Sequence, residues 1–144
     1  MSTIVRFFAA PDDKSASRVL RTGPRRVFES LPFGNFDPEE AVLEWESLLT
    51  DVSFEELIAA GEPHLIAGKD DDGPVVFAFS PLLCTALAEA GRSELKDAAA
   101  AWFLRQEGSR RVFNTELADL ILSDVAALVR KARDQGRSVY CWVG

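Results

Sequence analysis

The sequence predicts an α+β fold, in which a small mixed or antiparallel sheet packs against helices. Short apolar runs rich in β-branched and aromatic residues are typical of strands, and longer runs with apolar residues three or four apart are typical of helices. The expected strands lie near residues 3–8, 64–67, 74–79 and 138–143. Since the 144 residues contain no linker, repeat or low-complexity stretch, we expect a single domain over residues 1–144.

The N-terminal elements are the first expected strand and a short helix. The run STIVRFF carries the β-branched and aromatic residues that strands favour, and it is followed closely by Pro11. The next stretch, DDKSASRVLRTG, favours a short helix because Gly23 and Pro24 would end it.

The clearest helix signal begins at Asp37, which can cap a helix whose first position is Pro38. Glu40 completes a capping box three residues after the cap. One face of this helix is apolar and is expected to face inward through Val42, Trp45 and Leu49. The stretch SFEELIAAG repeats the pattern, with Ser53 as cap and Gly61 in the left-handed conformation that ends a helix.

The runs PHLIAG and PVVFAFS predict a hairpin whose loop is KDDDG. Asp and Gly suit such loops, because Asp bonds its neighbouring backbone and Gly accepts positive φ. The three aspartates also raise the question of a calcium loop, which needs acids at alternating positions and a glutamate six residues after its glycine. Phe79 stands at that position after Gly73, and the flanking segments favour strands, so we expect a turn and no metal site.

Three further helices and a strand are expected in the second half of the chain. The stretch SPLLCTALAEAG has Ser80 as cap and Pro81 at the first helical position. SELKDAAAAWFLRQEG predicts a second helix, which ends before Gly108. The apolar spacing over 115–135 predicts the longest helix, ended by Gly136, and SVYCWV predicts the last strand.

Several of these segments, taken in order, resemble a known family. They are an N-terminal strand, a Trp-containing helix ending LLTD, the run VVFAFSPLLCTALAEA and the C-terminal run VAALVRKARDQGRSVYCWV. In this order the chain resembles the bacterial YfbM-like family of unknown function, most clearly over the last 30 residues. The resemblance implies an α+β fold and a bacterial cytoplasmic setting. It implies no catalytic residues, because the family has no established activity.

The charge of the chain excludes some partners. Sixteen basic and 23 acidic residues give a formal net charge of −7, which argues against general binding to nucleic acid or to an anionic membrane and favours a basic protein as partner. The start of the chain shows neither a signal peptide nor a membrane-spanning helix, so we expect a cytoplasmic protein.

Candidates for chemistry are few. Two cysteines, Cys84 and Cys141, and one histidine, His64, cannot form a closed zinc site. Cys84 falls in the first turn of its expected helix, where the helix dipole favours a thiolate, and His64 on the neighbouring hairpin could serve as its base. Structural roles for both are the favoured interpretation. Ser80 lacks the G-x-S-x-G turn of a nucleophilic serine, and no phosphate-binding glycine motif indicates a nucleotide cofactor.

The acidic residues are concentrated in one part of the chain. Residues 27–68 hold ten acids and no Lys or Arg, whereas residues 1–26 hold six basic and two acidic residues. Three interpretations remain open: a solvated face with helix-capping acids, internal pairing, and a surface that attracts a basic protein. The arginines available for internal pairing are Arg18, Arg21, Arg25 and Arg26.

The loop ESLPFGNFDPEE places two aromatic residues directly before the acidic helix. Phe33 and Phe36 could anchor a partner inside an acidic rim, although Phe36 could instead pack on the first turns of the helix as a hydrophobic staple. We therefore predict a non-catalytic protein-binding module that uses the acidic surface of residues 33–56. Its candidate binding residues are Phe33, Phe36, Glu39, Glu40, Glu44, Glu55 and Glu56. The alternative is a small-molecule binder or an enzyme, with a pocket near the 64–79 hairpin formed by His64, Ser80 and Cys84.

Overall fold

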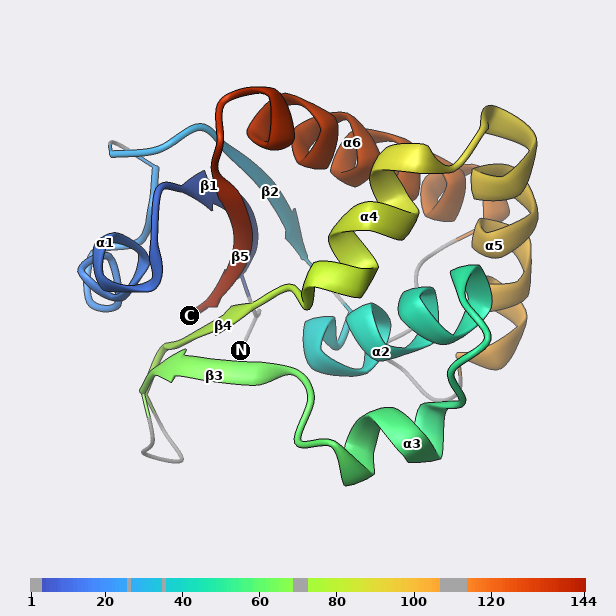
Figure 1. Cartoon of the computed structure of the whole chain (residues 1–144), viewed down its shortest axis with the longest axis horizontal. Helices are drawn as coiled ribbons and strands as arrows, with labels where there is room; N and C mark the ends of the chain where they lie inside the picture. The colour runs from blue at the N-terminus through green and yellow to red at the C-terminus, as the bar shows by residue number, and fades with distance from the viewer. Residues whose placement is uncertain (1–3, 26, 35, 69–72, 107–113) are drawn as a thin grey trace.

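A computed structural model describes residues 4–25, 27–34, 36–68, 73–106 and 114–144. Six helices and five strands lie in these ranges, with most helices on one side of the sheet (Figure 1). In chain order they are β1 (Ile4–Ala10), α1 (Asp13–Ser17), β2 (Ser30–Gly34), α2 (Pro38–Leu49), α3 (Phe54–Ala59), β3 (His64–Ala67), β4 (Val75–Ala78), α4 (Pro81–Glu89), α5 (Arg92–Arg105), α6 (Thr115–Asp134) and β5 (Ser138–Val143).

The strands form one sheet in the order β2-β1-β5-β4-β3, and every neighbouring pair is antiparallel. The α+β class is therefore confirmed, and of the two expected sheet types the antiparallel one is correct. The four strands expected from the sequence are β1, β3, β4 and β5. The hairpin of β3 and β4 is confirmed by its pairing, while the predicted loop residues 69–72 lie outside the described residues.

β2 lies where the sequence predicts a loop, so that prediction is wrong for Ser30–Gly34. Its sequence, SLPFG, contains a proline and a glycine, both of which weaken a strand prediction. β2 lies at an edge of the sheet and pairs only with β1, with Pro32 opposite Arg6. An edge strand tolerates proline because it needs hydrogen bonds on one side only.

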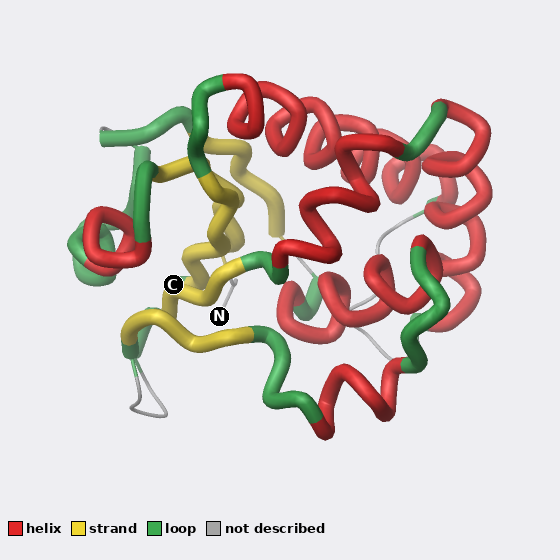
Figure 2. The backbone as a smooth tube through the Cα atoms, in the orientation of Figure 1, coloured by secondary structure: helices red, strands yellow, loops and turns green. Residues whose placement is uncertain are grey.

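Both faces of the sheet are covered (Figure 2). On one face, alternate residues of β1 such as Val5 and Phe7 pack against α2, α4, α5 and α6 in the larger core cluster. On the other face, Phe8 and Tyr140 pack with residues of α1 and the segment after it. Two hydrogen bonds fix this smaller layer: Tyr140 donates to Asp13 Oδ1 at 2.8 Å, and Trp142 Nε1 donates to the Leu20 carbonyl at 2.8 Å.

The expected helix caps are present. Asp37, Ser53 and Ser80 each accept backbone hydrogen bonds at the starts of α2, α3 and α4. The expected left-handed glycines are also found, with φ of 82° at Gly61 and 69° at Gly136. No helix in the described ranges has the length and apolar character needed to cross a membrane.

Candidate functional site

The acidic candidates lie on α2 and α3. Glu39, Glu40, Glu55 and Glu56 have exposed side chains. Glu44 differs from them, since its side chain is only 13% exposed and accepts a hydrogen bond at 2.8 Å from Arg105 of α5. Four of the five candidate carboxylates are therefore exposed, and the fifth, Glu44, is partly buried and paired with Arg105.

Glu44 and Glu55 line the same open cleft, of about 570 Å³, between α2, the start of α3 and the end of α5. Glu39, Glu40 and Glu56 do not line it. We call it the acidic cleft, and its lining consists of Glu44, Ser47, Ser53, Phe54, Glu55, Leu104 and Arg105. Two carboxylates and one guanidinium give this lining a formal charge of −1, beside apolar surface from Phe54 and Leu104.

Leu104 and Arg105 are not among the residues that the sequence predicts for the site. They stand about fifty residues after Glu55 in the sequence and reach the cleft because α5 packs against α2. Leu104 is 78% exposed, more than any other large apolar side chain in the described ranges. The sequence signal for this exposure was the position of Leu104 at the end of an otherwise amphipathic helix.

Of the two aromatic candidates, Phe36 is not an accessible anchor, and this part of the predicted site is wrong. Phe36 is 1% exposed and meets Trp102 edge-to-face, with ring centroids 5.5 Å apart. Phe33 is partly buried in β2 and contacts Phe7 at 5.9 Å between centroids. Both side chains join the larger core cluster, because burying an aromatic ring stabilises the fold more than presenting it to solvent.

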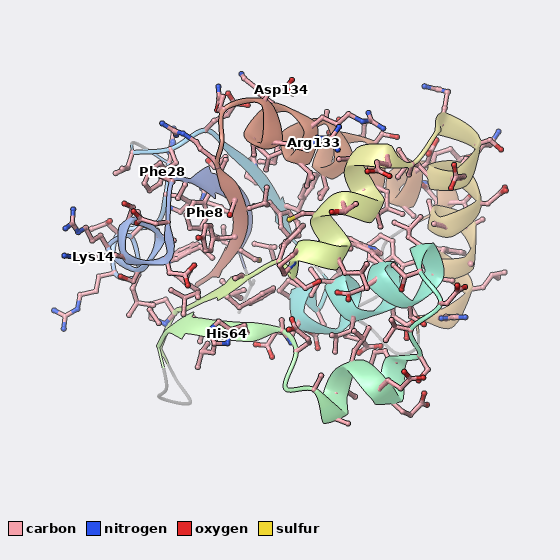
Figure 3. The ribbon with its side chains drawn as sticks, in the orientation of Figure 1. Phe8, Lys14, Phe28, His64, Arg133 and Asp134 are labelled. Atoms are coloured by element: carbon pink, nitrogen blue, oxygen red, sulfur yellow. The ribbon has the colours of Figure 1, made fainter. Side chains whose placement is uncertain are left out.

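His64 and Cys84 lie on opposite faces of the sheet. His64 of β3 is paired with Ala78 of β4, and residues directly opposite each other in an antiparallel pair project to the same face. Ala78 packs against the smaller cluster, whereas Cys84 packs against the larger one. Figure 3 shows His64 at the outer edge of the sheet on β3. The geometry therefore does not support a cysteine–histidine pair.

Cys84 is also a poor nucleophile. Burial raises the pKa of its thiol to about 11, although a hydrogen bond with the Val139 backbone lowers it in part. At neutral pH Cys84 is therefore a protonated, largely apolar group, which agrees with the favoured structural role and not with the alternative of a thiolate. The desolvation of the sulfur outweighs the field of the helix terminus.

Ser80 has a structural role that involves an unpredicted residue, Glu46. The Ser80 hydroxyl accepts a hydrogen bond from the Leu83 amide at 3.0 Å, which caps α4, and donates to Glu46 Oε1 at 2.6 Å. Glu46 is 4% exposed, so a carboxyl group lies inside the junction of α2 and α4. Its position one residue after Trp45 and four after Val42, on the inward face of α2, was the sequence signal.

Burial raises the pKa of Glu46 above its usual 4.5, the hydrogen bond from Ser80 partly lowers it, and the Glu62 carboxylate raises it further. A folded-state pKa above the unfolded value means that the folded protein binds the proton more tightly. The protein is therefore expected to lose stability as pH rises from the unfolded pKa through the folded pKa of Glu46.

We predict that Glu46→Gln stabilises the protein at pH 7. The amide removes a desolvated charge and its oxygen can still accept the Ser80 hydrogen bond. The gain should shrink as pH falls toward the usual carboxyl pKa of about 4.3, because a growing fraction of Glu46 is then protonated in both states. Urea unfolding of both proteins at pH 4 and pH 7 measures it, and a loss of stability at pH 7 would show that the ionised form is preferred.

Internal pairing occurs with different partners from those expected. In the described chain, Glu44 pairs with Arg105 and Glu29 with Lys131, so the cations come from α5 and α6. Arg18, Arg21 and Arg25 make no ion pair with the acidic stretch within the described ranges, and Arg26 lies outside them. These two pairs involve two of the ten acids. The N-terminal arginines belong to the segment that packs on the other face of the sheet, and this position keeps them away from the acids of α2 and α3.

The described residues contain no group of three or more His, Cys, Asp or Glu side chains placed to hold a metal ion. Asp70, Asp71 and Asp72 of the predicted hairpin loop lie outside the described residues, between the paired strands β3 and β4.

The fold and site define a five-stranded antiparallel α+β protein with an acidic cleft. The structure is similar to that of YfbM from Escherichia coli, a protein of unknown function, with a TM-score of 0.48 and 14% sequence identity over 98% of this chain and 99% of that one. No protein-family model matches the chain, and the comparison with curated proteins finds no match.

Proposed function

We propose that the protein is a non-catalytic domain of the bacterial cytoplasm that binds a basic segment of another protein in the acidic cleft. The observation that best supports this proposal is the meeting of Glu44 and Glu55 with the exposed Leu104 in one open cleft of about 570 Å³. A partner is expected to offer Lys or Arg side chains together with apolar surface.

The cleft matches such a segment chemically. Arg105 occupies Oε2 of Glu44, which leaves Oε1 without a hydrogen-bond donor in the described part of the chain. An incoming guanidinium or ammonium group can bind this oxygen and the exposed carboxylate of Glu55. The aliphatic stem of a Lys or Arg can then lie over Leu104 and Phe54, because long basic side chains bury their methylene groups while the charge stays near water.

The overall charge of the chain favours rapid encounter with a basic partner. Residues 27–68 contribute ten acids and no basic residue, and the chain as a whole carries −7. A field of one sign raises the association rate of an oppositely charged partner and weakens as salt is added. The Debye length falls from about 8 Å at 0.15 M salt to about 3 Å at 1 M, so binding by this mechanism is expected to be sensitive to salt.

The experiment compares three folded proteins as baits in a lysate of the native host. Wild type is used beside Glu55→Lys, which reverses a charge in the cleft, and Asp97→Lys, which makes the same change at an exposed position of α5 outside the cleft lining. Captured proteins are identified, and the affinity of each purified candidate is measured at 0.05 M and 0.5 M salt.

We expect a basic partner whose affinity falls at least tenfold in Glu55→Lys, equivalent to about 1.4 kcal/mol, and changes little in Asp97→Lys. Leu104→Ser should weaken the same complex, because it removes the apolar surface under the basic side chain without adding a charge. Capture of proteins that bind all three baits equally, or binding that is insensitive to salt, would refute a charge-dependent site in the cleft.

A further inference from the structure

A second pocket, of about 370 Å³, lies between the first turns of α4 and the end of α6. Its lining includes Phe79, Cys84, Val129, Arg133 and Arg137, and we call it the arginine pocket. The volume falls within the roughly 300–1,000 Å³ of typical small-molecule sites. This pocket is separate from the acidic cleft and shares no lining residue with it.

The charge of the arginine pocket opposes that of the protein. Both charged residues in its lining are arginines, and no acid lines it, although the chain carries −7 overall. Arg133 lies on the side of α6 that faces α4, whereas Asp134 lies on the outer side (Figure 3). Asp134 is thus directed away from the pocket, and the Glu46 carboxylate, whose charge reaches Cys84, does not line it.

The two guanidinium groups are available to a ligand. Arg133 approaches Glu89 at 3.8 Å, but both side chains are more than half exposed, and such surface pairs contribute little. Arg137 has no acidic partner within the described residues. A planar guanidinium binds a carboxylate through two parallel hydrogen bonds, so two of them can compete with water for one anionic group.

The inner wall of the pocket is apolar. Phe79, Val129 and Val139 are each at least 95% buried and close its base. Cys84 adds a neutral surface, since burial raises the pKa of its thiol to about 11. Thr85 lies at the rim and supplies a hydroxyl group. Apolar walls with a few polar groups at one end are the usual composition of a small-molecule site.

We propose that the arginine pocket binds a small organic acid, whose carboxylate is held by Arg133 and Arg137 and whose apolar body rests on Phe79, Val129 and Cys84. This inference is independent of the protein-binding function proposed above, because it concerns different residues and the opposite charge. It makes the protein a carrier or sensor of an organic acid, and no covalent step is involved.

The test measures binding of three acids, benzoate, phenylacetate and hexanoate, to the full chain by calorimetry. Benzamide has the body of benzoate without its charge, and inorganic phosphate is an anion without the apolar body. The variant Arg133→Gln/Arg137→Gln removes both guanidinium groups, and Arg18→Gln/Arg92→Gln makes the same charge change at exposed positions outside the pocket.

We expect saturable binding of at least one acid, weakened at least tenfold by the pocket variant and unchanged in the control variant, with benzamide and phosphate binding much more weakly. Bound acid should also slow modification of the Cys84 thiol by a neutral reagent in a Cys141→Ala background. The proposal is overturned if none of the acids saturates, if benzamide binds as tightly as benzoate, or if the pocket variant binds like wild type.

Discussion

Replacing Trp45 with alanine is expected to lower the free energy of unfolding by about 3–5 kcal/mol, the usual cost of truncating a buried aromatic residue. Trp45 is fully buried on the inward face of α2. Its ring lies edge-to-face on Trp102, with centroids 5.2 Å apart, and contacts Phe7 at 5.8 Å. Alanine would leave a cavity between α2, α5 and the sheet. The surrounding elements can fill this cavity only in part, because their own contacts hold them in place.

Trp45→Phe should cost less than Trp45→Ala. It keeps an aromatic ring against Trp102 and removes the indole Nε1, a buried donor with no hydrogen-bond acceptor in the described part of the chain. Urea unfolding followed by circular dichroism measures all variants without relying on tryptophan fluorescence. Leu104→Ala serves as the control, because Leu104 is 78% exposed and its truncation is expected to change stability by less than about 0.5 kcal/mol. A loss below about 1 kcal/mol for Trp45→Ala would show that α2 does not anchor the core.

The helices were largely predictable because their signals are local. Asp37, Ser53 and Ser80 each precede a helix and satisfy its first free amides through their own side chains. The burial of Trp45 was predictable from the spacing of apolar residues along α2. Apolar residues three or four apart lie on one face of a helix, and that face is the one that packs on the core. Such features depend on residues that are three or four apart.

The missed features depend on contacts between distant segments. β2 is stabilised as a strand by pairing with β1, which overrides the weak strand preference of Pro32 and Gly34. The acidic cleft needs Arg105, about sixty residues after Glu44. Local patterns of charge or spacing relate residues only a few positions apart. The sequence could therefore indicate the acidic residues but not the cleft that they form with Arg105.

The pair His64 and Cys84 shows a different limit. The two residues stand in neighbouring elements of the chain, which made a shared pocket reasonable. The register of β3 against β4 decides otherwise, because it places His64 opposite Ala78 on the face away from Cys84. A shift of one residue would reverse this result, since successive side chains of a strand alternate between faces.

Replacing Gly68 with alanine is expected to destabilise the protein by about 2–5 kcal/mol. Gly68 follows β3 and has a φ of +88°, a left-handed conformation that costs an L residue about 1–2 kcal/mol. An added Cβ would also overlap the backbone oxygen of Pro74 and approach Val75 Cα to 3.1 Å. Overpacking of this kind adds about 1–3 kcal/mol, and backbone atoms of the paired strand can yield only by disturbing the hairpin.

Gly61→Ala separates the two contributions to this cost. Gly61 has a similar φ of +82°, but nothing lies within 4 Å of the Cβ that alanine would add. Its substitution should therefore cost only the conformational part, about 1–2 kcal/mol. The difference between the two variants in urea unfolding measures the steric conflict with Pro74. Equal losses would mean that the backbone at Pro74 moves freely, and the close approach of Gly68 to β4 would then contribute nothing to the stability of the hairpin.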